Sequence, residues 1–248
     1  MNSSVRQVFL DRPEKANALT SAHLEKLRAD FAALRDDPDV RVVVLAGKGK
    51  TFCGGADISE LKALTAQTAG AFVEKIHQVC AAIRELPVPV VAQLHGAVIG
   101  AGLEIAAACD LRVAAEGTKF SMPEVRLGIP SVVEAAMLPR LVGTGRARWL
   151  LMTGATVGAA EALVWGLIEK LSPAEKLDET VDHALDAILA GEPEAIRAQK
   201  RLCKLWEEAP LAESVRASID EFAKSYESGE PRRRVAAFRA ARRKRSAA

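Results

Sequence analysis

Residues Pro89–Asp110 read PVVAQLHGAVIGAGLEIAAACD, and this stretch decides how the chain folds. It opens with an apolar run up to Leu94 that favours a strand. A glycine turn, Gly100–Gly102, then leads into a helical pattern. A strand, a glycine turn and a helix in this order leave unpaired backbone N–H groups at the start of the helix. Glu104 falls in the first turn of that helix, so the stretch predicts either a capped helix or a functional site.

Length and composition are those of an ordinary globular protein. The 248 residues suffice for one large α/β domain, alone or with an appendage. Aromatic residues make up only 4%, which argues against a surface that stacks nucleic-acid bases. The four cysteines form no C-x-x-C pair, so we expect no metal site and a reducing compartment. Without a signal-type N-terminal segment or a run long enough to span a bilayer, the expected location is the cytoplasm.

Positive charge is concentrated at the C-terminal end. Residues 231–248 hold eight basic residues and no acidic one, so the rest of the chain is net negative although the overall charge is +2. A basic tail can bind a phosphate-bearing ligand or a nucleic acid. The alternative is a solvated helix end whose cations favour the negative helix pole. The basic residues are Arg232, Arg233, Arg234, Arg239, Arg242, Arg243, Lys244 and Arg245.

Strands and helices alternate along most of the chain. Thr20 or Ser21 can cap a helix with an apolar face, and Val40–Ala46 is the near-continuous apolar run expected of a parallel strand buried on both faces. From Ser131 the pattern is helical with glycine breaks. After Pro173 it is entirely helical, with breaks at Gly191–Pro193, Pro210 and Gly229–Pro231. This order predicts an α/β fold followed by a helical extension. The other expected strands are Val5–Leu10, Val90–Leu94, Leu111–Ala115 and Leu167–Leu171.

Two glycine-containing turns follow predicted strands, and each precedes a carboxylate. One is Gly54–Ala56 and the other is Gly100–Gly102. Ligands of open parallel sheets bind beyond the carboxyl ends of the strands, where two such turns can aim two N–H groups at one oxygen, as an oxyanion hole does. Glu104 and Glu124 each lie just beyond a turn, and two carboxylates facing one pocket can divide acid and base work.

Four segments occur in the order and spacing of one known family. They cover residues 5 to about 172, and through them the chain resembles the crotonase superfamily, which is the enoyl-CoA hydratase/isomerase family. The resemblance implies a crotonase-like ββα superhelix over residues 1–190 and a C-terminal helical trimerisation region over residues 191–248. The segments are Arg12–Leu19, Phe52–Ile58, His95–Glu104 and Met122–Pro130.

The resemblance implies a coenzyme A thioester as substrate. Its carbonyl oxygen would be held by the N–H groups of Ala56 and Ala101; relatives mostly carry glycine at the second position, but only the N–H is needed. An enoyl-CoA hydratase of fatty acid metabolism is expected, a hydro-lyase in which Glu104 activates water and Glu124 transfers the proton. No separate cofactor is expected, because coenzyme A is part of the substrate.

The resemblance also implies coenzyme A contacts and an oligomer. A homotrimer, or a hexamer built as a dimer of trimers, is expected, with one residue near the C-terminus donated by a neighbouring subunit. No membrane partner is expected, and nucleic acid is an unlikely one. The expected substrate and coenzyme A contacts are Lys15, Ala16, Asp57, Ile58, Ser59 and Gly100, with Phe238 from the neighbouring subunit.

One segment departs from the family pattern, and several alternatives stay open. Relatives often have a glycine-rich stretch where this chain has Ser131–Glu134, so Glu134 either caps its helix or contacts a polar acyl group. Enoyl-CoA isomerase, acyl-CoA dehydratase or thioester hydrolase chemistry would use the same site. A dinucleotide fingerprint at Gly100 would have Ile105 where glycine or alanine is expected. A non-catalytic RNA-binding role through the basic tail is the other alternative.

Overall fold

The computed structural model describes residues 3–246, with side chains up to Ala240 and that of Arg242. Arg243, Lys244 and Arg245 of the basic tail therefore lie outside the described side chains. The chain forms two compact units, and the division falls between Ala190 and Gly191.

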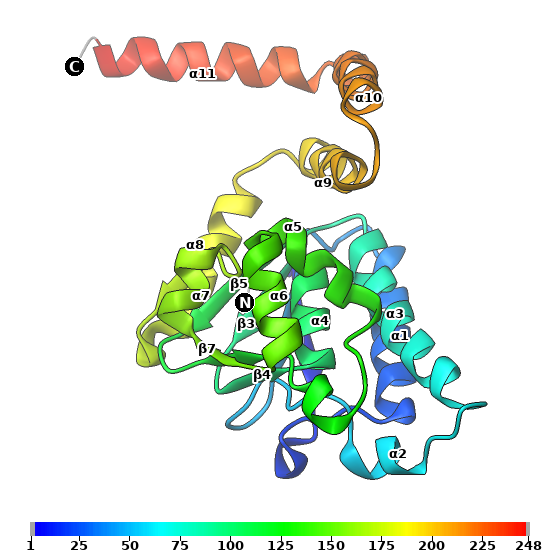
Figure 1. The fold of residues 1–248 in the computed structure, drawn as a ribbon. Helices are drawn as coiled ribbons and strands as arrows, with labels where there is room; N and C mark the ends of the chain where they lie inside the picture. Colours follow the sequence, from blue (N-terminus) through cyan, green and yellow to red (C-terminus); the bar gives the residue numbers. More distant parts are fainter. Residues whose placement is uncertain (1–2, 247–248) are drawn as a thin grey trace. The chain divides into compact units, whose positions relative to one another are not determined.

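The first unit is built on a parallel sheet. Within the described residues its strands are, in spatial order, β1 (Val5–Leu10), β2 (Val42–Gly47), β3 (Val90–Leu94), β5 (Leu111–Ala115) and β8 (Lys170–Ser172) (Figure 1). Every neighbouring pair is parallel, so all five carboxyl ends lie at one edge. The strand predicted at residues 167–171 is present but begins later, at Lys170.

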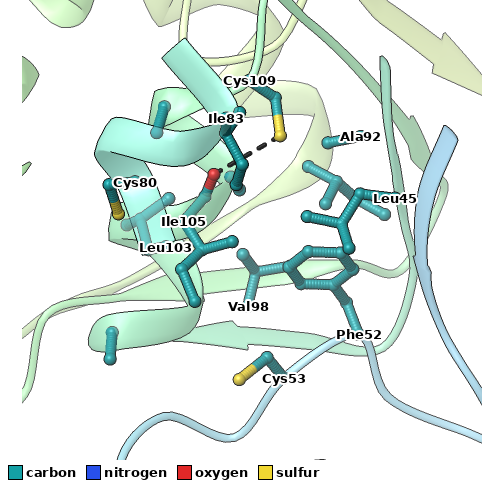
Figure 2. Packing of buried hydrophobic residues seen from close by; sticks show 14 of the residues in the cluster. Leu45, Phe52, Cys53, Cys80, Ile83, Ala92, Val98, Leu103, Ile105 and Cys109 are labelled. Atoms are coloured by element: carbon teal, nitrogen blue, oxygen red, sulfur yellow. Dashed lines mark hydrogen bonds between the residues drawn. The ribbon is translucent and has the colours of Figure 1, made fainter. Parts of the chain in front are cut away.

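Side chains of β2 alternate between two apolar layers. Val42 and Val44 pack on α8 (Leu177–Leu189), whereas Val43 and Leu45 face the larger core. That core includes α1 (Ser21–Arg35), α3 (Ala69–Glu85) and α4 (Ala101–Ala108). Figure 2 shows Phe52 of this core beside Leu45 and Val98, facing Leu103. Burial on both faces explains why the strand reads as an unbroken apolar run.

The first helix starts and packs as its sequence predicts. Thr20 is the N-cap of α1, and its Oγ1 accepts the N–H of His23 at 3.4 Å. Leu24, Leu27 and Phe31 recur at helical spacing and are all buried. Helix α1 packs on α3, which forms one wall of the cavity described below.

A second, smaller sheet was not predicted. Its strands β4 (Ala97–Ile99), β6 (Lys119–Ser121) and β7 (Thr156–Gly158) form a three-stranded sheet within the described residues. The predicted direct passage from Leu94 to the helix was therefore wrong, because β4 lies between them, and the helical pattern after Ser131 is interrupted by β7. Strands of three residues are too short to show an alternating pattern, which is why the sequence does not reveal them.

The remaining elements of the first unit are short. They are the 3₁₀ helices η1 (Pro13–Lys15), η2 (Glu124–Leu127), η3 (Val133–Met137) and η4 (Ala174–Lys176), and the α-helices α2 (Ile58–Ala63), α5 (Leu138–Val142), α6 (Thr144–Thr153) and α7 (Ala159–Trp165). Residues of α2 and η2 line the cavity, while α7 packs on the second sheet and on β8.

The second unit is helical throughout its described part. It consists of α9 (Pro193–Glu208), α10 (Leu211–Ser225), η5 (Tyr226–Ser228) and α11 (Glu230–Ser246). The breaks coincide with the predicted proline and glycine positions, and Arg201 of α9 pairs with Glu221 of α10 at 2.6 Å. Among residues 3–246 no helix combines the length and apolar content required for crossing a bilayer. The fold class predicted from the sequence, α/β with an all-helical end, is confirmed.

Candidate active site

A cavity of about 120 Å³ lies where the two glycine turns meet. The turns form one side, and apolar side chains of α3 form another. The segment from η2 to Val132 closes the remainder, and both predicted glutamates reach the lining. The residues that bear on its chemistry are Gly55, Ala56, Ile58, Phe72, Ile76, Gly100, Ala101, Glu104, Glu124, Ser131 and Val132.

The first turn leaves the amide of Ala56 unpaired. Leu19 donates its N–H to Gly55 O at 2.8 Å and accepts the N–H of Asp57 at 2.8 Å, as in a parallel bridge. In extended backbone, neighbouring N–H groups point to opposite sides, so that of Ala56 points away from Leu19. Among the described residues it has no recorded acceptor, and Ala56 lines the cavity.

The second turn places another unpaired amide at the same cavity. Gly100 is the N-cap of α4 with φ of 52°, a conformation that glycine adopts readily. Ala101 is the first residue of the helix, so its N–H has no partner inside the helix, and none is recorded elsewhere in the described part. A Cβ added to Gly55 would lie 4.0 Å from Ala101 N, so the two turns are in close contact.

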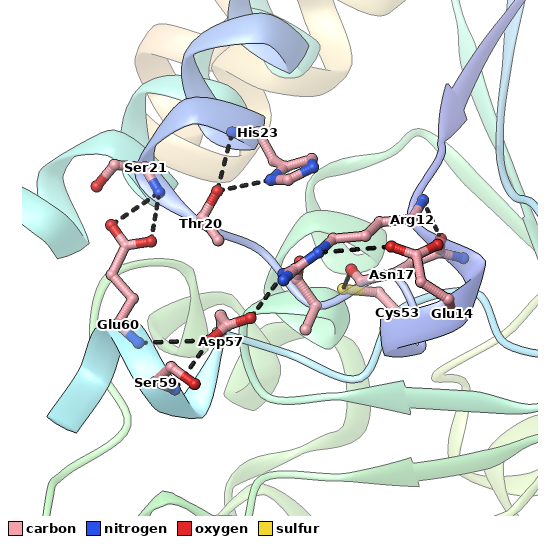
Figure 3. Close-up of polar contacts among 11 residues, drawn as sticks. Arg12, Glu14, Asn17, Thr20, Ser21, His23, Cys53, Asp57, Ser59 and Glu60 are labelled. Carbon is pink, nitrogen blue, oxygen red and sulfur yellow. Dashed lines mark hydrogen bonds and ion pairs between the residues drawn. The ribbon is translucent and has the colours of Figure 1, made fainter.

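An ion pair holds the first turn in place (Figure 3). Arg12 Nη1 donates to Asp57 Oδ2 at 2.6 Å, while Asp57 Oδ1 accepts the N–H groups of Ser59 and Glu60 at the start of α2. The Arg12 hydrogen bond is the main reason why the pKa of Asp57 is lowered. Both oxygens of Asp57 are therefore engaged within the chain, next to Ala56.

The loop before α1 is fixed by Asn17. Asn17 is buried and has φ of 56°, a left-handed conformation that asparagine tolerates better than most residues. Its Oδ1 accepts the N–H of Arg12 at 2.8 Å, and its Nδ2 donates to Lys48 O and Thr51 O. Its carbonyl accepts the thiol of Cys53 at 3.3 Å. The predicted contact residues Lys15 and Ala16 lie on this loop, at its exposed side.

Cys53 lies beneath both glycine turns. Its Sγ accepts the N–H of Gly55 at 3.4 Å, and a Cβ on Gly102 would lie 2.8 Å from the same sulfur. Burial raises the pKa of this thiol to about 12. Cys53 is thus a neutral packing group, and Gly102 is required by the close approach of α4 to it.

Glu104 is a buried carboxyl group with a strongly altered pKa. Only 4% of the residue is exposed, and its Oε1 accepts the N–H of Ala135 at 3.2 Å. Burial and then the nearby charge of Glu124 raise the pKa of Glu104 to about 8, with a smaller contribution from Glu134. A carboxyl group that exchanges its proton near neutral pH suits acid–base chemistry.

Glu124 approaches the same cavity from η2. Its Oε2 accepts the hydroxyl hydrogen of Ser131 at 2.8 Å. Its Oε1 lies directly against Gly100, where a Cβ would collide with it. Two carboxylates and two unpaired amides therefore share one small cavity. The amides can stabilise an oxyanion, and the carboxylates can transfer protons.

Glu134 does not cap its helix through its side chain. It lies in the first turn of η3, which has no side-chain cap, and its Oε1 instead bonds His77 Nδ1 at 2.8 Å. The residue is 7% exposed, and its Oε2 has no hydrogen-bond partner among the described residues. Val133, immediately before it, has φ of 42° although its side chain is β-branched.

Predicted site residues fall into two groups in the structure. Ala56, Ile58, Gly100, Ala101, Glu104 and Glu124 line the cavity together. Lys15, Ala16, Asp57 and Ser59 belong to the loop and helix start beside it, and Phe238 lies on α11 in the second unit with 69% of its surface exposed. Sequence reasoning missed Ser131, His77 and the α3 wall, since each reaches the site only through the tertiary fold.

Comparisons with known proteins identify the family of the chain. The model of the family described as enoyl-CoA hydratase/isomerase matches residues 1–245. A crotonyl-CoA hydratase of Syntrophomonas wolfei is 33% identical over 236 residues, covering 93% of this chain and 90% of that protein. A short-chain-enoyl-CoA hydratase of Clostridium acetobutylicum is 35% identical over 199 residues, covering 79% and 76%.

Solved structures show the same architecture. The crystal structure of an enoyl-CoA hydratase from Mycobacterium smegmatis superimposes with a TM-score of 0.88 at 31% identity, covering 90% of this chain and 88% of that one. One from Bacillus anthracis gives a TM-score of 0.85 at 31% identity, covering 89% and 86%. The chain therefore has the crotonase fold and is an enzyme of the enoyl-CoA hydratase/isomerase family.

Proposed function

We propose that the protein is an enoyl-CoA hydratase that adds water across the Cα–Cβ double bond of a 2-enoyl-CoA thioester. The observation that carries this proposal is that Glu104, Glu124 and the amides of Ala56 and Ala101 line one cavity. The relatives named as crotonyl-CoA and short-chain-enoyl-CoA hydratases support it. Phe72, Val73 and Ile76 give the cavity an apolar wall that suits an acyl chain.

Oxyanion stabilisation is the first part of the proposed mechanism. The thioester oxygen would lie between the N–H groups of Ala56 and Ala101, with no competing acceptor recorded for either in the described chain. When water oxygen bonds to Cβ, the π electrons move to this oxygen and give an enolate. Two fixed donors stabilise that charge more than the neutral carbonyl, which lowers the barrier.

Proton transfer by the two glutamates is the second part. Glu104 takes a proton from the attacking water, and Glu124 gives a proton to Cα. One turnover adds OH to Cβ and H to Cα, so it moves one proton from Glu124 to Glu104, and that proton returns before the next turnover. Because the pKa of Glu104 is about 8, the ionised form that accepts the proton is a minority species at neutral pH.

Coenzyme A would lie along the loop before α1 and the start of α2. Exposed Lys15 offers a cation for a phosphate, and Ile58, which is 63% exposed, offers an apolar surface at the cavity edge. Asp57 fixes the backbone of this segment, because both of its oxygens are already bonded. Arg232–Arg234 and Phe238 on α11 of a neighbouring subunit are further candidates for the nucleotide.

An oligomer accompanies this proposal. Helix α10 exposes Leu211, Ile219 and Phe222 at 81%, 58% and 67%, and together with Trp206 they line a groove of about 650 Å³ within the second unit. Apolar surface of this extent favours burial against another subunit. We propose a homotrimer or a hexamer of two trimers, which light scattering on the purified protein measures directly.

The test of the reaction is hydration of crotonyl-CoA, followed by loss of the absorbance of the conjugated thioester. Wild type should turn over, and Glu104→Ala and Glu124→Ala should each lose about two to four orders of magnitude in kcat. Normal turnover by the Glu124→Ala variant would refute the proposed division of roles. If wild type left crotonyl-CoA unchanged but isomerised or hydrolysed other acyl-CoA thioesters, the reaction would be another one of the same family.

A further inference from the structure

One segment contacts both proposed catalytic glutamates. Ser131 donates its hydroxyl to Glu124 Oε2 at 2.8 Å, and the N–H of Ala135 donates to Glu104 Oε1 at 3.2 Å. Val132, between them, lines the cavity. The conformation of residues 131–135 therefore determines where both carboxylates lie, and this is the segment whose sequence departs from the glycine-rich stretch of relatives.

The segment contains a strained residue. Val133 has φ of 42°, in the left-handed region that β-branched residues avoid. A glycine would adopt this conformation freely, but valine does so only where surrounding contacts hold it. With φ of Val133 positive, the backbone that follows it directs the Ala135 N–H toward Glu104 Oε1. The same N–H also donates to Val132 O at 3.0 Å.

The side chain next to the strained residue ties the segment to α3. Glu134 is buried, and its Oε1 bonds His77 Nδ1 at 2.8 Å, while 49% of the His77 side chain is exposed. The buried thiol of Cys80, also on α3, is a second polar neighbour of Glu134, and burial followed by the charge of Glu134 raises the pKa of that thiol. Glu134 is therefore tied to α3 through two side chains.

We propose that Glu134, held by His77, is a positioning residue for Glu104 that keeps the strained Val133 turn closed, so that the Ala135 N–H reaches the Glu104 carboxylate. The inference rests on the proposed function in one respect, namely that Glu104 performs acid–base chemistry. His77 takes part in this positioning, because its hydrogen bond anchors Glu134 to α3.

Electrostatics give this arrangement a second effect. The titratable groups facing Glu104 are Glu124 from η2, Glu134 from η3 and Cys80 from α3, while His77 and Cys80 face Glu134. The charge of Glu134 contributes to the raised pKa of Glu104, after burial and Glu124. Removing that charge while keeping the shape should therefore lower the pKa of Glu104, whereas a purely structural residue would leave it unchanged.

The experiment measures the titration of Glu104 and the turnover separately. Protein labelled with ¹³C at glutamate carboxyl groups is titrated by NMR without substrate, and the Glu104 signal is assigned by its absence in Glu104→Gln. The variants are Glu134→Gln, which keeps an oxygen acceptor for His77, and Glu134→Ala, which keeps none. Glu85→Gln is the matched control, since Glu85 lies on α3 and pairs with Arg35 at the surface.

Glu134→Gln should lower the midpoint of Glu104 by at least about half a pH unit and leave kcat near neutral pH within about threefold of wild type. Glu134→Ala should lower kcat by about tenfold or more, because the Ala135 N–H turns away. Adding Val133→Gly to Glu134→Ala should restore most of that loss, since glycine adopts the positive φ without an anchor. Glu85→Gln should change neither quantity.

Unchanged midpoints in both Glu134 variants, together with kcat within about twofold of wild type, would overturn the positioning role. So would a failure of Val133→Gly to restore turnover in a variant that is folded by circular dichroism. If wild type proved inactive on crotonyl-CoA while the midpoint still moved in Glu134→Gln, the proposed reaction would be wrong and the inference about Glu134 would stand.

Discussion

Arg12 and Asp57 form an ion pair, with 2.6 Å between Nη1 and Oδ2, that joins the loop after β1 to the start of α2. Asp57 directly follows Ala56, so this pair fixes the direction of an amide that lines the cavity. Both side chains are mostly shielded from solvent, at 21% and 11% exposure, so the pair is screened less than the ion pairs on the surface.

Asp57→Asn should weaken both folding and turnover. Asparagine still caps α2, but the charged partner of Arg12 is lost, which costs about 1–2 kcal/mol of unfolding free energy in urea titrations. Because the pKa of Asp57 is lowered in the folded protein, its contribution is present above the pKa of the unfolded chain. The difference between wild type and variant should therefore shrink as the pH falls through the folded pKa.

The matched control is Glu85→Gln, which breaks the pair between Arg35 and Glu85. Those side chains are 47% and 50% exposed, so the loss should be below about 0.5 kcal/mol. Equal effects of the two substitutions would contradict a special role for the Arg12–Asp57 pair.

Gly100→Ala should abolish most activity while the protein remains folded. The new Cβ would collide with Glu124 Oε1 and displace that carboxylate from the cavity. We expect kcat on crotonyl-CoA to fall by about a hundredfold or more. Gly117→Ala separates this effect from backbone strain, because Gly117 has φ of 82° but open space around it. A similar loss of activity in both variants would mean that backbone strain at a positive φ, and not the collision with Glu124, inactivates Gly100→Ala.

Ser131→Ala should lower kcat about tenfold with little change in KM. The substitution removes the hydrogen bond to Glu124 Oε2, so the carboxyl group loses its fixed orientation, and a tenfold effect corresponds to about 1.4 kcal/mol. Ser172→Ala is a suitable control, since Ser172 bonds Thr180 at 2.7 Å and does not line the cavity. An unchanged kcat in Ser131→Ala would mean that Glu124 is held by other contacts.

The pH dependence of kcat/KM should fall above about pH 8 for the wild type. The proposed mechanism needs one proton on the pair of glutamates, because Glu104 acts in its ionised form while Glu124 supplies the proton for Cα. Burial and the charge of ionised Glu124 raise the pKa of Glu104 to about 8, so the pair loses its last proton near this pH. A profile that instead rises through pH 8 would mean that the active form carries no proton on either glutamate, and it would contradict the proposed division of roles.

Much of the site could be predicted because its parts are local in sequence. The start of α4 follows from Gly100, and Glu104 is placed by helical spacing alone. The glycine turns likewise follow strands whose apolar runs are easy to recognise. By contrast, His77 and Glu134 are 57 residues apart and Ala135 and Glu104 are 31 apart, so their contacts depend on how η3 folds against α3 and α4.

The missed strands have a different cause. β4, β6 and β7 each contain three residues, and Phe120 and Val157 are buried by pairing between strands rather than by an alternating pattern. Ser131 illustrates the same limit in the site. As a serine outside a nucleophile motif it predicts no chemistry, yet its hydroxyl bonds a carboxylate of the proposed acid–base pair.

The sulfur beneath the two turns has a practical consequence. Cys53 is shielded completely, and its neutral form does not react with alkylating reagents, whereas Cys203 is exposed. Modification of Cys53 therefore requires the two turns to separate, and its rate reports how often these turns open in the native protein. The alkylation rate of Cys53, compared with that of exposed Cys203, therefore measures local opening of the two glycine turns.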